Sequence, residues 1–464
     1  MELDVEFENN RESEIEKFVG IERYSTSEYD AIGGIYKDTH KDFIVKEVTE
    51  NGKILEIKED HETPPYLPDR DNFTTFNLVK INIDTFEAIK KICKELGISR
   101  YDIFYSGLKD KRSISVQKVS IKGNYTQKLK NLNIRDIFIR SITPTQKPVN
   151  LGSNRGNNFT IIIRNIQKSK DLENRIEIIL EKLRKDGFPN YFGLQRFGKY
   201  RPNSHLIGRA LLEGDYEKAF REFVSRTYSS ESSNLSRIRK KIGDALGNIN
   251  KLRKVFRKFP RGLNYECKLI AHVIQHPGDY KGAFEKINKD LLNLIINAFQ
   301  SYLFNKMISL RVKKGYSLFE PVEGDVIGIL DDINGIVTDV RYIYGNTYDK
   351  YLDQAIDLNR ATIVAPIIGF DTNLNEFPLM KSIFKEIKEE ENLNEEIFDS
   401  HFLNRYDLKG SIRAQTIKPI GLDLIEFSDD ESYKGKKKLK IEFSLNKGCY
   451  ATMLLRELIK RNNT

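Results

Sequence analysis

The hydrophobic pattern changes along this chain, and that change sets the strongest limit on its fold. Over about the first 200 residues, short β-branched runs predict strands, and helical patterns separate them. From about residue 205 to 409 helical patterns dominate, including the apolar segment 290–315. A charged hairpin or loop at 428–440, a strand, a turn and a closing helix follow. A chain of 464 residues with this pattern should form two or three domains.

Two helices are marked clearly by their ends. In one, Asp84 and Glu87 form the pattern of a capping box, and Gly97 supplies the stop. The residues expected on its buried face are Phe86, Ile89, Cys93 and Leu96. The other helix stops at Gly187, and its apolar stripe consists of Leu172, Ile176, Ile179, Leu180 and Leu183. Strands are predicted at residues 42–48, 54–59, 76–83, 103–107, 114–123 and 158–166.

The charge balance favours an anionic partner. The chain has 76 Lys and Arg against 67 Asp and Glu, a net charge of +9, and nucleic acid is the leading candidate for such a surface. Residues 237–261 contain ten Lys or Arg and one Asp. Such a run forms either a solvated helix face or a surface that follows phosphates.

Several familiar classes of site are not supported. The three cysteines are far apart and form no CxxC pair, so the sequence predicts no disulfide framework or cysteine zinc site and favours a reducing, intracellular setting. No apolar run approaches the ~20 residues of a membrane span, and no GxGxxG or GxxxxGK[ST] motif indicates a nucleotide site. His272 and His276 have the spacing of a zinc helix, but the glutamate of HExxH is missing and Pro277 follows, so we expect no metal there.

A single acid stands in a basic turn in the segment SGLKDKRSISVQ. Asp110 is flanked by Lys109, Lys111 and Arg112, just after a predicted strand and a glycine. A carboxylate can act as a covalent nucleophile if it stays ionised, and neighbouring cations favour that state by lowering its pKa. The same cations could bind phosphates, with Gln117 as a further hydrogen-bonding group on the next strand. The alternative is a charged turn that merely faces water.

The segment NYFGLQRFG combines three aromatic residues and two glycines with Asn190 and Arg196. The glycines allow unusual backbone turns and close approach. An exposed ring near Arg196 would suit a splayed base that stacks on the ring while its phosphate is neutralised nearby. The alternative is that the aromatic residues fill a core.

Together these segments resemble the TruD family of RNA pseudouridine synthases, in particular its archaeal and eukaryotic branch. The matching segments occur in family order along nearly the whole chain, and they are GGIYKDTHKDFIVKEV (33–48), SGLKDKRSISVQ (106–117), GNNF (156–159), NYFGLQRFGKYRPN (190–203), FQSYLFN (299–305) and LNKGCYATMLLREL (445–458). The resemblance is weakest between residues 225 and 290, which are similar to the extra helical material of that branch.

The resemblance implies that a uridine within RNA is isomerised without cofactor or metal: the glycosidic C–N bond breaks, the uracil turns in place and its C5 joins the ribose C1′. The family's nucleophilic aspartate falls on Asp110, which attacks either C1′ or C6. The lysine of its first motif falls on Lys37, expected beside Asp110 as a charge partner. Phe192 falls on the aromatic that stacks on the flipped base, and Asn190 on the neighbouring polar position. Further pocket positions are Gln117, Arg196 and Lys447, the last expected to approach Asp110.

The implied fold class is α+β: a mixed, largely antiparallel sheet domain interrupted by a large, mostly helical α+β insertion. The catalytic domain would comprise residues 1–204 and 410–464, and the insertion, 205–409, would contribute to RNA binding. The implied partner is tRNA, with no membrane and no obligate protein partner, in the cytoplasm. Uridine 13 of the D-arm is the expected target and uridine 35 of the anticodon loop the second choice. The alternative is a catalytically inactive tRNA-binding protein.

Overall fold

The computed structural model describes residues 4–5, 12–198, 200–331, 336–345, 347–394, 397–398 and 408–460. The chain forms two compact units. The sheet unit comprises Thr26–Phe188 and Lys418–Lys460, and the helical unit comprises Met1–Ser25, Pro189–Ile417 and Arg461–Thr464. The units therefore change at 25/26, 188/189, 417/418 and 460/461. The division at 204/205 and 409/410 that the sequence predicts for the domains stays a prediction.

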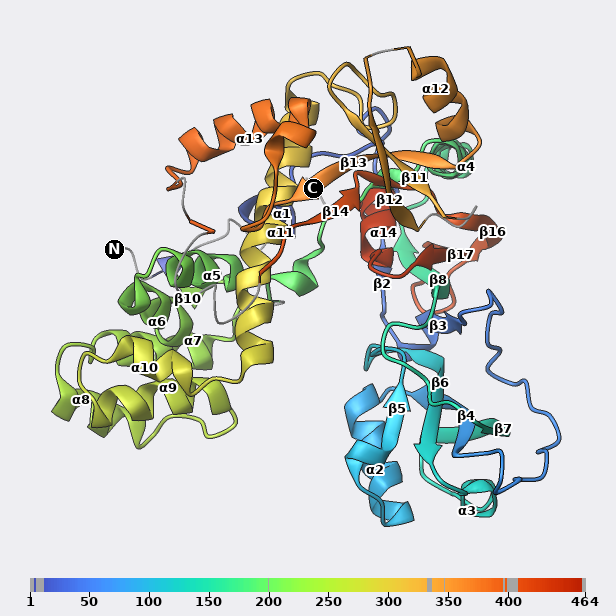
Figure 1. The fold of residues 1–464 in the computed structure, drawn as a ribbon, viewed down its shortest axis with the longest axis horizontal. Coiled ribbons are helices and arrows are strands. Elements are labelled where there is room, and N and C mark those ends of the chain that lie inside the picture. Colours follow the sequence, from blue (N-terminus) through green and yellow to red (C-terminus); the bar gives the residue numbers. More distant parts are fainter. Residues whose placement is uncertain are drawn as a thin grey trace. The chain divides into compact units, whose positions relative to one another are not determined.

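A single sheet of nine strands runs through the sheet unit (Figure 1). Its main path is β16 (Ile420–Asp429), β17 (Lys437–Asn446), β8 (Gly156–Ile166), β3 (Phe43–Val48), β6 (Ile114–Lys122), β4 (Phe73–Ile81) and β7 (Ile137–Thr145). The short strands β2 (Ile35–Tyr36) and β5 (Ile103–Tyr105) pair with β8 and β6. All these pairs are antiparallel except β3 with β6. The predicted continuous, largely antiparallel sheet is confirmed.

The strand β17 fits into this sheet because its polarity alternates. In β17 the buried residues are Leu439, Ile441, Phe443 and Leu445, and polar residues lie between them. The turn between β16 and β17 makes the charged segment a hairpin. Behind it, α14 (Ala451–Ile459) packs against α4 (Leu172–Lys185). The stripe predicted for α4 is buried at all five positions, and Gly187 follows it with φ 86°.

The helix α2 (Thr85–Leu96) has the predicted ends, and its buried face includes the predicted Ile89 and Leu96, with Cys93 partly buried against the same core, but not Phe86. The Asp84 side chain accepts a hydrogen bond from Glu87 N, and Gly97 is left-handed. The buried residues are Thr85, Ala88, Ile89, Ile92 and Leu96. Phe86 is exposed instead, with the Arg100 guanidinium 4.7 Å from its ring centroid. The prediction for Phe86 was wrong because the helix meets the core of the sheet through Ala88, Ile89 and Ile92 instead.

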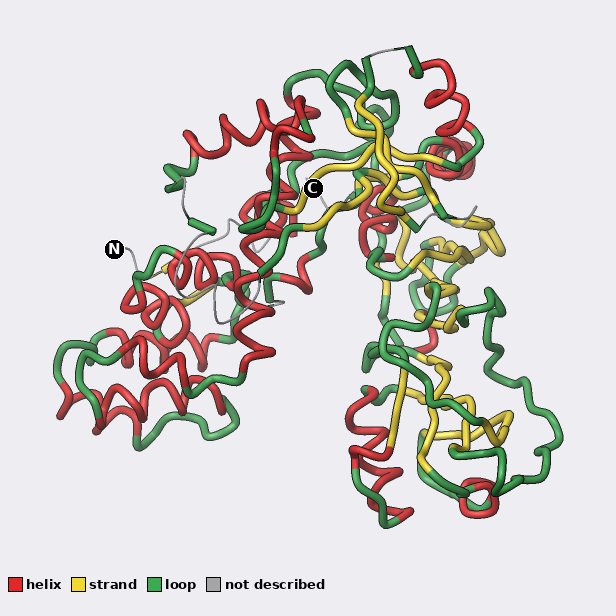
Figure 2. The backbone as a smooth tube through the Cα atoms, viewed as in Figure 1, coloured by secondary structure: helices red, strands yellow, loops and turns green. Residues whose placement is uncertain are grey.

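The strand predicted at 54–59 is also wrong. Only Ile54 forms a bridge, with Val48, and the chain continues as part of a long loop between β3 and β4 (Figure 2). Leu55 is buried against Val79 and Val116, with Ile57 partly buried beside it. The alternating apolar positions therefore anchor a loop onto the sheet and form no ladder of their own.

Helices dominate the helical unit. Its longest helix, α11 (Lys289–Lys313), has α5 (Ser204–Leu212) packed along it (Figure 1). Further helices of this unit are α6 (Tyr216–Val224), α7 (Ser233–Gly243), α8 (Ile249–Phe256), α9 (Asn264–Gln275), α10 (Tyr280–Glu285), α12 (Asp349–Asp357) and α13 (Pro378–Glu390). An antiparallel sheet has the order β12 (Val337–Ile343), β11 (Val326–Leu330), β13 (Ala361–Ile367) and β14 (Ser411–Ala414). It shares a small core with α12 that contains Ile327, Leu352 and Ile363.

The remaining elements are short, and they are α1 (Glu12–Phe18), α3 (Thr126–Lys130), β1 (Asp4–Val5), β9 (Phe188–Pro189), β10 (Thr227–Tyr228) and β15 (Thr416–Ile417). Within the described ranges, no helix combines the length and the apolar character needed to cross a membrane.

Candidate functional site

Asp110 lies in the loop between β5 and β6 and forms an ion pair with Lys37. The Lys37 ammonium donates a hydrogen bond to Asp110 Oδ2. The Asp110 side chain is 43% exposed and that of Lys37 17%, so solvent can reach the carboxylate while most of the Lys37 side chain is buried. Lys37 Nζ also lies 3.8 Å from the ring centroid of Phe43, a contact that favours a cation. The structure thus brings together the two residues expected as nucleophile and charge partner.

The loop that carries Asp110 is held from beneath by a buried ion pair. Lys109 Nζ lies 3.1 Å from Glu47 Oε2 and donates to Asn157 Oδ1 at 2.7 Å. Glu47 accepts two further hydrogen bonds, from Ser106 Oγ at 2.5 Å and from Lys118 N at 3.1 Å. A buried charge is tolerated only when it is paired and hydrogen-bonded in this way. Lys109 therefore fixes the loop through contacts with buried protein groups.

A second set of buried hydrogen bonds joins this loop to α2 and β6. The Thr85 hydroxyl accepts from Lys109 N at 2.9 Å and donates to Gln117 Oε1 at 2.9 Å. Gln117 Nε2 in turn donates to Gly107 O at 2.8 Å. Gln117 has no exposed surface. Both Lys109 and Gln117, expected as RNA contacts, are thus buried among protein groups, and the geometry suits them to holding the loop.

The other predicted cations of this region face solvent. Lys111 and Arg112 are exposed, and the Arg112 guanidinium donates to Asp38 O. Lys447, in the turn after β17, is exposed and donates to Gly152 O at 3.0 Å. Gly152 N donates to Ser106 O at 2.7 Å. Lys447 therefore reaches the segment that contacts the start of the Asp110 loop.

Asn190, Phe192 and Arg196 belong to the helical unit. Phe192 is backed by α11, because Asn305 Oδ1 accepts from Phe192 N at 2.8 Å and Asn305 Nδ2 donates to Phe192 O at 3.0 Å. Its ring meets Phe304 edge-on at 5.6 Å. Phe192 is buried, with 9% of the residue exposed, and Tyr191 and Phe197 are buried as well, so the exposed ring expected in this segment is not found in the free protein. Arg196 lies 5.9 Å from the ring centroid and donates to Ser301 Oγ at 3.2 Å.

Arg413, which the sequence reasoning missed, ties Asn190 to Phe192. Its guanidinium carbon lies 4.1 Å from the Phe192 ring centroid, and its nitrogens donate to Asn190 O at 3.0 Å and Asn190 Oδ1 at 2.6 Å. Asn190 is buried and donates to Ala414 O at 2.9 Å. Arg413 follows the aromatic segment by more than 200 residues, so no local pattern indicated the contact. Glu47 and Thr85 were missed for the same reason.

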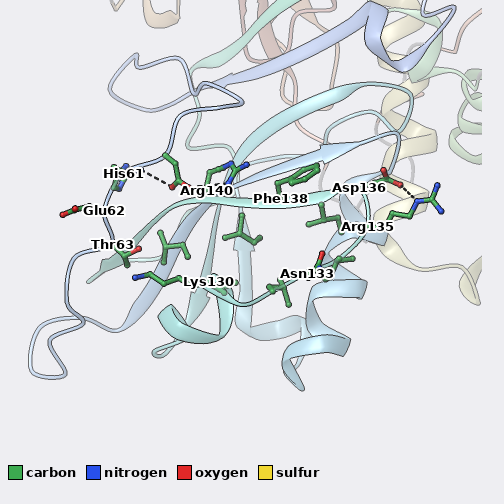
Figure 3. Close-up of a pocket in the computed structure, with 16 residues that line it drawn as sticks. His61, Glu62, Thr63, Lys130, Asn133, Arg135, Asp136, Phe138 and Arg140 are labelled. Atoms are coloured by element: carbon green, nitrogen blue, oxygen red, sulfur yellow. Dashed lines mark hydrogen bonds and ion pairs between the residues drawn. The ribbon is translucent and has the colours of Figure 1, made fainter.

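The sheet unit also has a hollow of about 670 Å³ lined by Asp60–Thr63 and by residues of the segment 129–142 (Figure 3). None of the predicted site residues line it. Two ion pairs lie on its wall, Arg140 with Asp60 at 3.6 Å and Arg135 with Asp136 at 3.5 Å (Figure 3). The residues that line this hollow lie outside the motif segments that carry Asp110 and Lys37.

No metal centre is found in the described part of the chain, where no group of three or more His, Cys, Asp or Glu side chains could hold an ion. The rings of His272 and His276 lie 4.7 Å apart, and His272 Nε2 is 2.7 Å from Asp279 Oδ2. That contact lowers the pKa of Asp279, helped by the hydrogen bond from Gly282 N. His272 is therefore engaged in a local hydrogen bond with Asp279.

Comparison with known proteins gives one consistent result. The family model described as tRNA pseudouridine synthase D (TruD) matches residues 18–458. A protein of Methanosarcina barkeri named "Probable tRNA pseudouridine synthase D" is 32% identical over 96% of this chain and 98% of its own length. One of Methanocaldococcus jannaschii, "Probable tRNA pseudouridine synthase D 1", is 30% identical over 96% and 100%. A crystal structure of a Methanosarcina mazei protein, described as "Putative tRNA pseudouridine synthase D (TruD)", has a TM-score of 0.78 at 29% identity, covering 96% of this chain and 98% of that one.

Proposed function

Because the chain belongs to the TruD family of tRNA pseudouridine synthases, we propose that it converts uridine to pseudouridine in tRNA with Asp110 as the nucleophile. The observation that carries this assignment is the Lys37–Asp110 ion pair, in which the carboxylate remains open to solvent. The carboxylate is the form that attacks, and the Lys37 ammonium beside it balances its charge.

The proposed reaction conserves every atom of the nucleotide. The Asp110 carboxylate attacks C1′ of the ribose or C6 of the uracil, and the bond between N1 and C1′ breaks. The detached uracil turns, and C5 bonds to C1′. One proton leaves C5 and one is gained at N1, and the carboxylate is released. Lys37 balances the charge of Asp110 before attack and after release, so we assign it an electrostatic role.

The target base must leave its stack to reach Asp110, at a cost of a few kcal/mol. We propose that Phe192 stacks on the extruded uracil and that Asn190 lies beside it. Stacking on an aromatic ring supplies about 1–3 kcal/mol per base. In the free protein Arg413 covers one face of the ring, so a base that uses this face displaces its guanidinium. Arg196, Lys111, Arg112 and Lys447 are proposed to contact the RNA backbone, and Lys109 and Gln117 to hold the loop.

The proposed substrate is uridine 13 in the D-arm of tRNA in the cytoplasm, and uridine 35 of the anticodon loop is the alternative. The test is incubation with unmodified tRNA transcripts and mapping of pseudouridine by carbodiimide adduct and primer extension. Transcripts with cytidine at position 13 or 35 separate the two sites. We expect product at 13, none in the transcript that lacks that uridine, and none anywhere with Asp110→Asn.

A matched control is Asp136→Asn, another exposed aspartate in a loop of the same unit. It should retain wild-type activity. A wild-type protein that binds tRNA without forming pseudouridine would support the inactive-binder alternative and end the enzyme assignment for this chain. Full activity in Asp110→Asn would remove Asp110 from the chemistry.

A further inference from the structure

A buried lysine touches the backbone of the proposed nucleophile. Lys80, on β4, has no exposed surface. Its Nζ donates to Asp110 O at 2.7 Å and to Ile83 O at 2.7 Å. The ammonium thus links the residue that carries the chemistry to the segment that leads into α2. Lys80 was within a predicted strand, but nothing in its neighbours indicated this contact.

Burial of an ammonium at this position is unfavourable in free energy. Transfer of a charge out of water costs several kcal/mol unless nearby groups compensate it. Here burial lowers the pKa of Lys80 to about 8. The charged groups that face it are Asp110 and Asp84, which oppose this decrease, and Lys109, which adds to it. A methionine would fill similar space without the charge, but it would take a hydrogen-bond donor away from the Asp110 and Ile83 carbonyls.

The carbonyl of Asp110 receives a second donor. Ser113 Oγ lies 2.7 Å from the same oxygen, and Ser113 O accepts from Asn82 N at 3.0 Å. Two donors on one carbonyl oxygen fix the plane of the peptide that follows Asp110. Since the carbonyl is held toward Lys80, the orientation of the Asp110 main chain is set, and its carboxylate is presented to Lys37.

We propose that Lys80 is a positioning residue: its ammonium holds the Asp110 carbonyl and thereby fixes the direction in which the carboxylate attacks. This inference rests on the proposed function of Asp110. A hydrogen bond from a charged donor is roughly twice as strong as one from a neutral donor. Deprotonation of Lys80 therefore loosens the loop without removing any group that touches RNA.

The test compares Lys80→Met with Lys122→Met. Lys122 is an exposed lysine at the end of β6 that is farther along the chain from Asp110. Single-turnover rates at saturating tRNA and the Kd for tRNA are measured for each. We expect the rate of Lys80→Met to fall about 10- to 100-fold, the scale of a misplacement of about 1 Å, with Kd within about twofold. Lys122→Met should match the wild type. Circular dichroism checks that each variant is folded.

The pH profile separates positioning from a merely structural role. The wild-type rate should fall as the pH rises through about 8, because the ammonium is lost over that range. Lys80→Met should lack this fall. A wild-type rate in Lys80→Met, or the same fall in both proteins, would overturn the proposal. If Lys80→Met does not fold, the wild-type profile decides, and a flat rate from pH 7 to 9 refutes it. If the wild-type protein forms no pseudouridine, the proposed function is refuted, and this outcome is distinct from a failure of the proposal for Lys80.

Discussion

Replacing Glu47 by methionine tests whether the Asp110 loop depends on its buried ion pair. The side chains of Lys109 and Glu47 are 4% and 2% exposed, so Glu47→Met leaves an ammonium without its counter-charge away from water. Removing one partner of a buried pair costs about 3–5 kcal/mol. The Ser106 hydroxyl and Lys118 N–H also lose their acceptor, so we expect the upper part of that range.

The assay is urea unfolding followed by circular dichroism, with hydrogen exchange of peptides that cover residues 103–122. A matched control is Lys91→Met, which removes an exposed pair with Glu87 at 3.8 Å and should cost only about 0.3–0.5 kcal/mol. The double variant Glu47→Met/Lys109→Met should recover part of the loss, since it leaves no unpaired charge. A loss below about 1 kcal/mol in Glu47→Met, with unchanged exchange in the loop, would refute this reasoning.

Three further predictions concern charge. Lys37→Met should lower the single-turnover rate about tenfold, and Lys37→Arg should retain more of the rate, because only Lys37→Met removes the cation beside Asp110. Equal rates in the two variants would contradict the electrostatic role of Lys37. Replacing the exposed Lys254 and Arg257 by glutamine should reduce the slope of log Kd for tRNA against log salt by about 1–2 if their run follows phosphates, and an unchanged slope would make it a solvated face. Hydrogen bonds from Lys438, its own backbone and Arg164 lower the pKa of Glu431 to about 2, so its stabilisation is present above pH 4.5 and lost as the pH falls toward 2; acid unfolding of Glu431→Gln should be less steep there.

Local signals predicted the elements that depend on local chemistry. The ends of α2 follow from Asp84 and Gly97, whose roles involve only residues within one turn. The stripe of α4 follows from helical spacing. By contrast, the buried face of α2 and the loop at Leu55 depend on what lies opposite in the sheet. Periodicity shows that a face is apolar, but the size of the neighbouring side chains decides which residues fit against it.

The candidate site divides in the same way. Asp110 and Lys37 could be predicted because they lie within recognisable sequence motifs. Lys80, Glu47 and Arg413 could not be predicted in this way. Each of these three acts through partners that are distant in sequence, such as Lys80 with Asp110 and Arg413 with Asn190. Their residue types are ordinary in a charged chain. The role of each of these residues follows from its contacts, and these contacts form only when the chain folds.

The pairing of β8 with β17 has a consequence for how the protein is made. β8 lies in the first part of the chain, and its partner leaves the ribosome only after the entire segment Pro189–Ile417 has been synthesised. Until then, one edge of β8 lacks the neighbour that covers it along its length, and an uncovered strand edge invites pairing with other chains. A premature stop before residue 437 would therefore yield a product prone to aggregation, even though this product would already contain both Lys37 and Asp110.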